Sequence, residues 1–191
     1  KPRLEFVNPG FRWRRSLISA CLAGDGVIAY PTEGVWGLGC LPGSFEAVAR
    51  ILALKRRSRD QGLLLVAADI SQFEDYLTGL EVDKRAELDN NWPGPVTYLV
   101  PDNGVAPRWV IGNNVTVGLR VSDHPVVRAL CESTGPLVST SANVTGHRAA
   151  LTSLQVRQYF GEGVDHLVPG QLGNSIGPSV IKHLVTGEKI R

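Results

Sequence analysis

The spacing of apolar residues predicts most of the helices. In 12–23, apolar residues recur three and four positions apart, and Gly24 and Gly26 follow at once, as glycines do where helices end. A helix is therefore expected over 12–23. Further helices, two of them largely polar, are expected over 70–78, 81–91, 126–132 and 153–160.

The helix that begins after Ser44 carries a lysine on its apolar face. Ser44 is a favourable N-cap, and Ile51 and Leu52 continue an apolar stripe. Lys55 lies four residues after Ile51 and three after Leu52, so we expect its side chain to face the protein body. Arg57 would point in another direction from the same helix. The two cations can converge on one ligand only if the helix ends between them, as the polar run that follows indicates.

Short apolar or alternating runs predict the strands. Residues 63–68 are an unbroken apolar run between Gly62 and Asp69, which is typical of a strand buried on both faces. Other strands are expected over 27–30, 96–100, 115–121, 137–140, 179–184 and 188–190. Helices and strands thus intermix, and we expect one α/β domain over 1–191.

The end of the first strand is the first candidate site. Pro31 fixes its own φ and favours an extended residue before it, so the strand should end where Thr32 and Glu33 begin. Open α/β sheets bind ligands beyond the carboxyl ends of their strands, and Gly37 and Gly39 would let backbone approach a ligand closely. A glycine-rich hairpin without a ligand is the alternative.

Composition and charge narrow the class of protein. With 43% hydrophobic and 20% charged residues, the 191-residue chain has the composition of a folded domain, and disorder is not indicated. A formal net charge of only +2 means that a nucleic-acid surface would need local clustering, for which 55–59 is the candidate. Cys21, Cys40 and Cys131 lie far apart, which argues against a zinc knuckle or a disulfide framework. No stretch resembles a signal peptide or a membrane span, so we expect a cytoplasmic protein.

Three predicted strands end in loops of different chemistry. The loop at 32–33 offers a hydroxyl and a carboxylate, the loop from Arg120 offers a guanidinium, and 139–143 offers three hydroxyls and an amide. Lys55 and Arg57 would add two further cations. Cations and many hydrogen-bond donors together suit a polyphosphate ligand, whose oxygens they neutralise and orient.

Standard nucleotide and catalytic motifs are absent from the sequence. It has no GxxxxGK[ST], and Pro42 stands where a dinucleotide fingerprint beginning at Gly37 would need its third glycine. Ser139-Thr-Ser141 lacks the GxSxG context of a hydrolase nucleophile, and the four histidines have no metal-ligand spacing, so no metal ligand is expected. Taken singly, 55–59 is typical of a solvated helix end, and Arg120 of a salt-bridged strand residue.

The order of the motifs is more specific than any one of them. Along the chain come Pro31-Thr-Glu33 with Gly37-Leu-Gly39, Leu54-Lys55-Arg56-Arg57, Trp92-Pro-Gly-Pro-Val-Thr97, Arg120-Val-Ser-Asp-His-Pro125 and Ser139-Thr-Ser-Ala-Asn143-Val-Thr-Gly146. In this order the motifs resemble the YrdC family, from about residue 26 to 185. The resemblance implies a single-domain YrdC-like fold, with a twisted mixed β-sheet, helices packed on its faces and a cationic concave site.

The resemblance also implies an activity. Members of the family are L-threonylcarbamoyladenylate synthases, nucleotidyltransferases that condense L-threonine, bicarbonate or CO2, and ATP to threonylcarbamoyl-AMP and pyrophosphate. The product feeds threonylcarbamoyladenosine (t6A) modification of tRNA through downstream threonylcarbamoyl-transfer complex proteins. Mg2+ would accompany ATP, contact with tRNA or double-stranded RNA is expected, and no membrane partner is.

The resemblance assigns the site residues by their positions in the motifs. Thr32 and Arg120 are expected at the threonine, and Lys55 and Arg57 at the phosphates as the catalytic residues. The predicted ATP-binding residues are Lys55, Arg57, Thr97, Ser139, Ser141 and Asn143. Which of them meet the nucleotide and which the amino acid stays open. Ser58 and Gln61-Gly62 depart from the family pattern, which leaves the course of the loop over the nucleotide open as well.

Two rival functions use the same residues. A non-catalytic module for double-stranded RNA or tRNA would employ the cations against a phosphate backbone, but it would need exposed charge and not a cluster of hydroxyls around an inward-facing Lys55. A carbamoyl transferase of the hydrogenase-maturation type would bring acylphosphatase and zinc-finger segments, which this sequence lacks.

Overall fold

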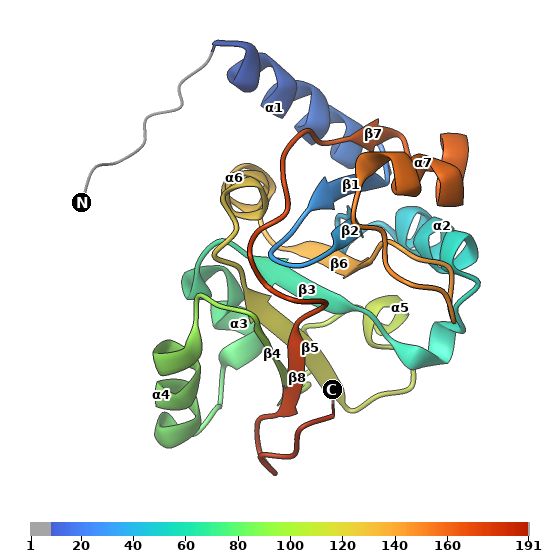
Figure 1. Cartoon of the computed structure of the whole chain (residues 1–191). Coiled ribbons are helices and arrows are strands. Elements are labelled where there is room, and N and C mark those ends of the chain that lie inside the picture. The colour runs from blue at the N-terminus through green and yellow to red at the C-terminus, as the bar shows by residue number, and fades with distance from the viewer. Residues whose placement is uncertain (1–8, 191) are drawn as a thin grey trace.

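The structure is a computed structural model that describes residues 9–190, which form one mixed sheet with helices on both faces (Figure 1). Its α-helices are α1 (Pro9–Ala23), α2 (Phe45–Lys55), α3 (Glu74–Leu77), α4 (Val82–Asn91), α5 (Arg108–Ile111), α6 (Pro125–Thr134) and α7 (Ser153–Phe160). Its strands are β1 (Ile28–Pro31), β2 (Trp36–Cys40), β3 (Leu64–Ala67), β4 (Val96–Pro101), β5 (Thr116–Val121), β6 (Leu137–Ser141), β7 (His166–Leu167) and β8 (Val180–His183). Short 3-10 helices are η1 (Arg59–Gln61), η2 (Ile70–Phe73) and η3 (Gly161–Gly163).

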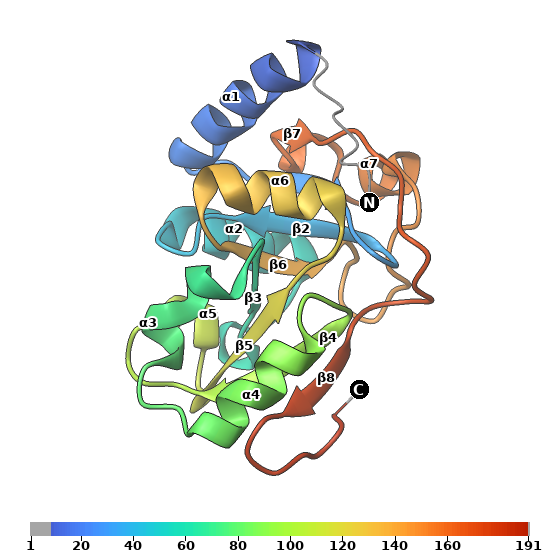
Figure 2. The same ribbon diagram turned by 90° about the vertical axis from the view of Figure 1, so that its left-hand side faces the viewer.

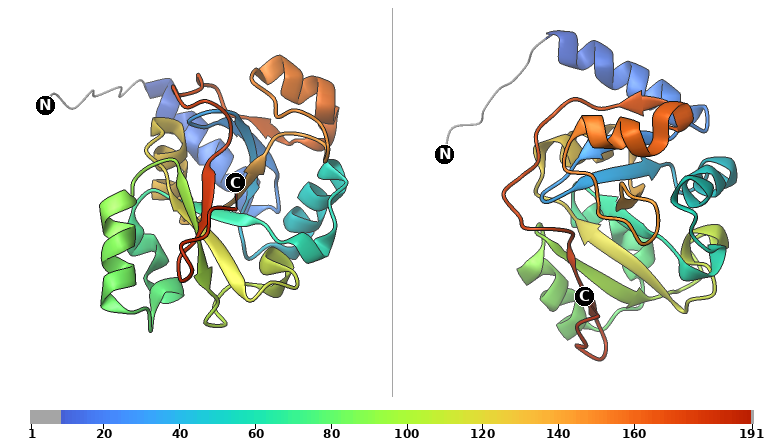
Figure 3. Two further views of the ribbon diagram at one scale, coloured as in Figure 1. Left: turned by 60° about the horizontal axis from the view of Figure 1, so that its bottom comes forward. Right: turned by 45° about the vertical axis from the view of Figure 1, so that its right-hand side comes forward.

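The eight strands lie in the order β7-β1-β2-β6-β3-β5-β4-β8. The pairs β1–β7, β3–β5 and β4–β8 are parallel, and the other pairs are antiparallel. β7 and β8 therefore form opposite edges of the sheet although they follow each other in sequence. The 168–179 connection between them crosses the whole sheet, as the red segment in Figures 1 and 3 shows.

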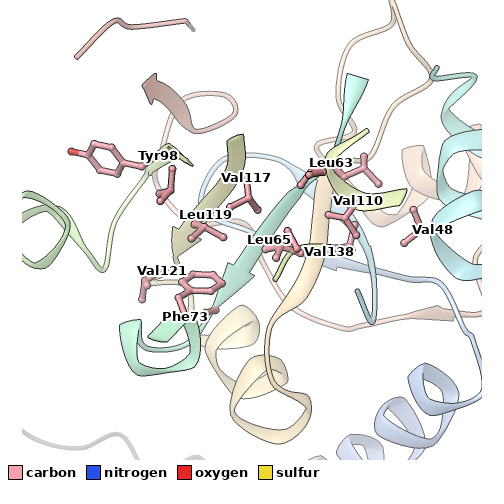
Figure 4. Packing of buried hydrophobic residues seen from close by; sticks show 14 of the residues in the cluster. Val48, Leu63, Leu65, Phe73, Tyr98, Val110, Val117, Leu119, Val121 and Val138 are labelled. Atoms are coloured by element: carbon pink, nitrogen blue, oxygen red, sulfur yellow. The ribbon is translucent and has the colours of Figure 1, made fainter. Parts of the chain in front are cut away.

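The largest hydrophobic core lies on one face of the sheet. Leu65, Leu119 and Val138 point from the strands into this core, where they meet Val48 of α2 and Phe73 of η2 (Figure 4). Side chains alternate between the two faces of a strand, so each of these strands turns its other residues to the opposite face. The helices that close this core are α2, α3, α4 and α5.

The opposite face is covered only over part of its area. There, Ile18 and Leu22 of α1 and Val127 of α6 pack on Ile28 and Tyr30 of β1 in a second buried cluster (Figure 2). Among residues 9–190, no helix covers the strands towards β4 and β8 on this face, and the 168–179 connection passes there (Figure 1). This uncovered part is where the candidate site lies.

The sequence correctly predicted how α2 begins and ends. The Ser44 hydroxyl accepts a hydrogen bond from the Ala47 amide at 3.0 Å, so Ser44 is the N-cap. The helix ends at Lys55 because Arg56 adopts the left-handed conformation, with φ of 50°. Lys55 faces the protein body and is 2% exposed, as the spacing indicated. The predicted break between Lys55 and Arg57 is confirmed.

Other elements differ from the expectation. The prediction of a strand over 188–190 is wrong. The segment makes a single bridge, Lys182 to Lys189, because after the turn at Gly187 it forms only two backbone hydrogen bonds with the edge strand β8. The 27–30 strand pairs antiparallel with β2, which the apolar pattern did not reveal because glycines occupy alternate positions of β2. Residues 32–35 are thus the turn of a hairpin, which confirms the hairpin of the alternative interpretation but does not test whether a ligand binds there.

Two further observations concern the cysteines and the lengths of the helices. The three cysteines are free thiols, so no disulfide framework exists. None of the helices within residues 9–190 is long and apolar enough to cross a bilayer.

Candidate active site on the open face of the sheet

A cavity of about 280 Å³ lies on the uncovered part of the sheet face. Its floor comes from strands β2 to β6, one wall is the hairpin turn, and residues 175–180, at the end of the connection to β8, form a second wall. Its volume is close to the lower limit of typical small-molecule sites, about 300 Å³. Of the predicted site residues it contains Thr32, Thr97, Arg120, Ser139 and Ser141.

The register of the strands explains why glycines and hydroxyl-bearing residues lie together on this floor. Ser141 lies opposite Gly37, while Leu64 lies between Ser139 and Gly118 on the two neighbouring strands. Paired residues share a face, so glycines and hydroxyls gather on the side away from the large core. At Gly118 a Cβ atom would lie only 2.2 Å from a Leu64 methyl group, so a side chain there would displace that of Leu64.

Thr32 holds the hairpin turn together. Its hydroxyl donates to the Val35 carbonyl at 2.7 Å, and its amide donates to the same oxygen at 3.2 Å. The hydroxyl proton is therefore engaged within the protein. What Thr32 presents to the cavity is an oxygen with an unused lone pair, which can accept a hydrogen bond from an amine or a hydroxyl.

Arg120 forms an ion pair with Glu33. Arg120 Nη1 lies 2.7 Å from Glu33 Oε2, and both side chains are largely buried, at 10% and 12% exposed. Glu33 Oε1 accepts from the Ser122 hydroxyl at 2.6 Å and from the Asp123 amide at 3.2 Å. Burial alone would raise the pKa of Glu33, but Arg120 and the Ser122 hydrogen bond outweigh it and hold that pKa below its usual value. The carboxylate thus fastens the hairpin turn to β5.

Lys55 lies beside the cavity and binds the chain that leaves β6. Its Nζ donates to the carbonyl of Ser141, to the carbonyl of Asn143 at 3.0 Å and to Asn143 Oδ1 at 3.1 Å. The Ser141 hydroxyl also donates to Asn143 Oδ1, at 2.7 Å. Burial, and then the neighbouring Arg57, lower the pKa of Lys55 to about 8, while the three acceptors act in the opposite direction. All three ammonium donors are therefore engaged with protein acceptors.

Arg57 also points to backbone oxygens. Its Nη2 donates to the Gly62 carbonyl at 2.9 Å and lies 3.5 Å from that of Gln61. These contacts close the loop in which Ser58 and Gln61-Gly62 depart from the family pattern. Gly62 has φ of 67°, a conformation in which glycine is unstrained.

The 168–179 connection closes one side of the cavity. Its Gly173 and Ser175 amides donate to the Thr32 and Glu33 carbonyls at 3.0 and 2.9 Å. Farther along, the Ser179 hydroxyl lies 2.9 Å from that of Thr97. A segment that links the two edges of the sheet thereby supplies a wall of the cavity beside the hairpin turn.

The structure thus sorts the predicted site residues into two groups. Thr32, Thr97, Arg120, Ser139 and Ser141 line the cavity. Lys55, Arg57 and Asn143 do not line it, although Lys55 and Asn143 reach it through the backbone of Ser141. The roles assigned to them remain predictions, as does the cationic character of the site, because within the cavity Glu33 offsets the charge of Arg120.

Sequence reasoning missed two contributors to this site, Tyr30 and Ser179, and it named the Glu33 carboxylate without its partner. Tyr30 donates to the Ser139 hydroxyl at 2.8 Å, Ser179 lies against Thr97, and Glu33 anchors Arg120. A signal for Tyr30 existed, since a large aromatic residue preceded a strand with glycine at alternate positions. No local signal could indicate Ser179, because its partner lies 82 residues away.

The donors around the cavity do not form a cage for a divalent cation. Mg2+ prefers several oxygens, usually with one or two carboxylates. The cavity carries one carboxylate, Glu33, whose oxygens already serve Arg120, Ser122 and Asp123. Among residues 9–190 there is also no cluster of three His, Cys, Asp or Glu side chains. These residues do not fit a resident metal, so we expect Mg2+ to come bound to the phosphates of ATP.

Fold and cavity together define a mixed α/β protein with a candidate small-molecule site on one face of its sheet. The family model Sua5/YciO/YrdC, described as telomere recombination, matches residues 20–191. The chain therefore belongs to the Sua5/YciO/YrdC family.

Curated relatives match the chain over nearly their full length. The threonylcarbamoyl-AMP synthase of Marinobacter nauticus is 54% identical over 186 residues, which cover 96% of this chain and 97% of the relative. That of Stutzerimonas stutzeri is 48% identical over 179 residues, covering 94% and 97%. The resemblance to the YrdC family inferred from the motif order is thus confirmed.

Solved structures share the fold. P. abyssi Sua5 complexed with L-threonine superposes with a TM-score of 0.85 at 26% identity and covers 93% of this chain, which spans about half of that protein (52%). E. coli YciO superposes with a TM-score of 0.81 at 24% identity, covering 94% of this chain and 90% of that one. The expected twisted mixed sheet with helices on its faces is confirmed.

Proposed function

We propose that the protein is an L-threonylcarbamoyladenylate synthase, a nucleotidyltransferase. The observation that carries the proposal is the 54% identity, over 97% of its length, to a relative that bears this name. The reaction joins L-threonine, bicarbonate and ATP, and releases threonylcarbamoyl-AMP, pyrophosphate and water. The nitrogen of threonine forms the carbamate, and a carbamate oxygen then displaces pyrophosphate from the α-phosphorus.

The polarity of the cavity suits an amino acid that becomes a carbamate. Thr32 can only accept, and so favours an amine or a hydroxyl, whereas Arg120 favours an anion. The hydroxyls of Thr97, Ser139 and Ser141 extend the floor from Arg120 across β4 and β6. We place threonine between Thr32 and Arg120, and the phosphates of ATP along the hydroxyls towards Arg57.

No enzyme nucleophile is required by this chemistry. Two anions, the carbamate and the triphosphate, must be held together. Binding in one cavity brings them close, and cationic donors offset their repulsion. Arg57 and Lys55 would serve the triphosphate after exchanging backbone acceptors for phosphate oxygens. Mg2+ bound to ATP would neutralise further charge.

The fate of the adenylate product is also a proposal. We infer that the adenylate is handed to downstream threonylcarbamoyl-transfer complex proteins for t6A formation in tRNA in the cytoplasm. A non-catalytic module for double-stranded RNA is not favoured, since Lys55 is buried and the cavity offers hydroxyls, neither of which serves a phosphate backbone from outside.

The test is an assay with ATP, labelled bicarbonate and one amino acid at a time. We expect labelled adenylate and pyrophosphate only when threonine and bicarbonate are both present. Arg57→Ala should weaken ATP use by about tenfold or more, because a charge-assisted contact contributes on the order of 1.5 to 3 kcal/mol. Arg56→Ala, which changes the exposed residue directly before Arg57, is the matched control. Release of ADP and phosphate would contradict the proposed reaction.

A further inference from the structure

Tyr30 approaches the cavity across the glycines of β2, on the same face of the sheet as Ser139. It lies in β1, its side chain is fully buried, and its ring crosses β2 towards β6. A Cβ atom on Gly39 would lie 2.8 Å from Tyr30 Cε1, and one on Gly37 would lie 3.4 Å from Tyr30 Cζ. At Gly39 a side chain would therefore displace the ring. The alternating glycines of β2 make room for Tyr30, a reason different from the ligand approach that the sequence suggested.

The hydroxyl of Tyr30 fixes the direction of a hydrogen bond. It donates to Ser139 Oγ at 2.8 Å. Burial raises the pKa of Tyr30 far above its usual value, so the phenol keeps its proton and remains a donor at any working pH. Within residues 9–190, Tyr30 is the one side chain that hydrogen-bonds to Ser139. Ser139 therefore accepts from Tyr30, and its own proton is available to an acceptor in the cavity.

We propose that Tyr30 is a positioning residue that makes the Ser139 hydroxyl a fixed donor, so that the substrate group at Ser139 is an oxyanion. This inference rests on the proposed function and deepens it. It assigns an oxygen of the carboxylate, the carbamate or a phosphate to Ser139, and it assigns the amine of threonine to the accepting side of the cavity, at Thr32.

The decisive variant is Tyr30→Phe, which keeps the ring and removes only the hydroxyl. Without that donor, Ser139 can turn its proton to other acceptors, and the oxyanion loses an oriented partner. We expect the rate of pyrophosphate release at limiting substrate to fall about tenfold. In the Ser139→Ala background the same change should cost less than about twofold, because the group through which Tyr30 acts is already missing.

Tyr98→Phe is the matched control. Tyr98 is also fully buried, but it points into the large core on the other face of the sheet (Figure 4). Its variant should keep the rate within about twofold of the wild type. Melting temperatures of all variants separate loss of packing from loss of positioning, since a packing defect would lower the rate equally in both Ser139 backgrounds.

Titrating threonine and ATP separately identifies the oxyanion. A higher KM for threonine in Tyr30→Phe indicates the carboxylate or carbamate, and a higher KM for ATP indicates a phosphate; either supports the proposal. An unchanged rate for Tyr30→Phe, or an equal loss with and without the Ser139 hydroxyl, overturns it. If the wild type itself forms no adenylate, the proposed function fails separately, and binding isotherms of L-threonine and ATP to the same variants then test the coupling of Tyr30 and Ser139.

Discussion

The cavity and the Lys55 cluster share strand β6 but use its polar groups differently. In the cavity, Ser139 presents a hydroxyl, and Thr32 and Ser141, whose protons are donated to Val35 and Asn143, present lone pairs. In the Lys55 cluster, which comprises Lys55, Asn143 and the Ser141 carbonyl, every ammonium donor already has a protein acceptor. Ser141 belongs to both, since its side chain faces the cavity and its carbonyl binds Lys55.

Because of this difference, substitutions in the same motifs should affect two different properties, the use of substrate and the stability of the fold. Groups with unused hydrogen-bonding capacity can be lost with little effect on folding, but a substrate then lacks a partner. Other groups already use their hydrogen bonds inside the protein. Their loss leaves buried acceptors unpaired, which lowers the free energy of unfolding. Substitutions in the Lys55 cluster should thus lower the stability of the protein, and substitutions in the cavity should impair its use of substrate.

The largest effect is expected for Lys55→Ala. It removes three charge-assisted hydrogen bonds at a buried position, so we expect a loss of about 3 kcal/mol in the free energy of unfolding, or roughly 10 °C in melting temperature. Circular dichroism during heating measures it, with the exposed Arg56→Ala as the control. A melting temperature within about 2 °C of the wild type would mean that Lys55 does not hold the β6 loop and acts on substrate alone.

A smaller effect is expected for Glu33→Gln. The amide keeps the shape but loses the charge that pairs with Arg120, which should cost about 2 kcal/mol at pH 7. Because the pKa of Glu33 is lower in the folded protein than in the unfolded chain, its contribution is complete above the unfolded value, near pH 4.5, and is lost as pH falls through the folded value. Urea unfolding of both proteins at a series of pH values measures this.

The difference in stability between Glu33→Gln and the wild type should therefore shrink on acidification. The exposed Glu162→Gln, which lies outside the cavity, is the control and should track the wild type at each pH. A difference that stays constant from neutral to acidic pH would show that the charge of Glu33 does not stabilise the fold.

The smallest effect is expected for Thr32→Val. Loss of the accepting oxygen should raise the KM for threonine about tenfold, corresponding to about 1.4 kcal/mol, with little change for ATP. Loss of the bond to the Val35 carbonyl should also cost about 1 kcal/mol in stability. Thr32→Ser keeps the hydroxyl and is the control. An effect confined to ATP would move Thr32 to the nucleotide end, and no effect on either substrate would leave the residue with a role in the turn alone.

The sequence was most informative where neighbouring residues decide the structure. Ser44 caps α2, the apolar stripe directs Lys55 inward, and the helix ends before Arg57, all as the spacing predicted. These features depend on residues three or four positions apart. The strand expected over 188–190 failed because one bridge to β8 depends on the turn and the sheet edge and not on local apolar content.

The candidate site was predicted as a set of residues but not as an arrangement. Motif order indicated that Thr32, Thr97, Arg120, Ser139 and Ser141 belong together, and they line one cavity. Which polar groups are free and which are used was not predictable, since Glu33 meets Arg120 87 residues away and Lys55 meets Asn143 88 residues away.

By itself, the sequence determined the helices, most of the strands, the α/β class and the family, because periodicity, caps and ordered motifs are written in local residue types. Only the tertiary structure decided that Tyr30 crosses the glycines of β2 to reach Ser139, and that the 168–179 connection crosses the sheet to close the cavity. The physical reason is that hydrogen-bond partners across a sheet are set by strand order and register, and a one-residue change of register would turn each of these side chains to the opposite face.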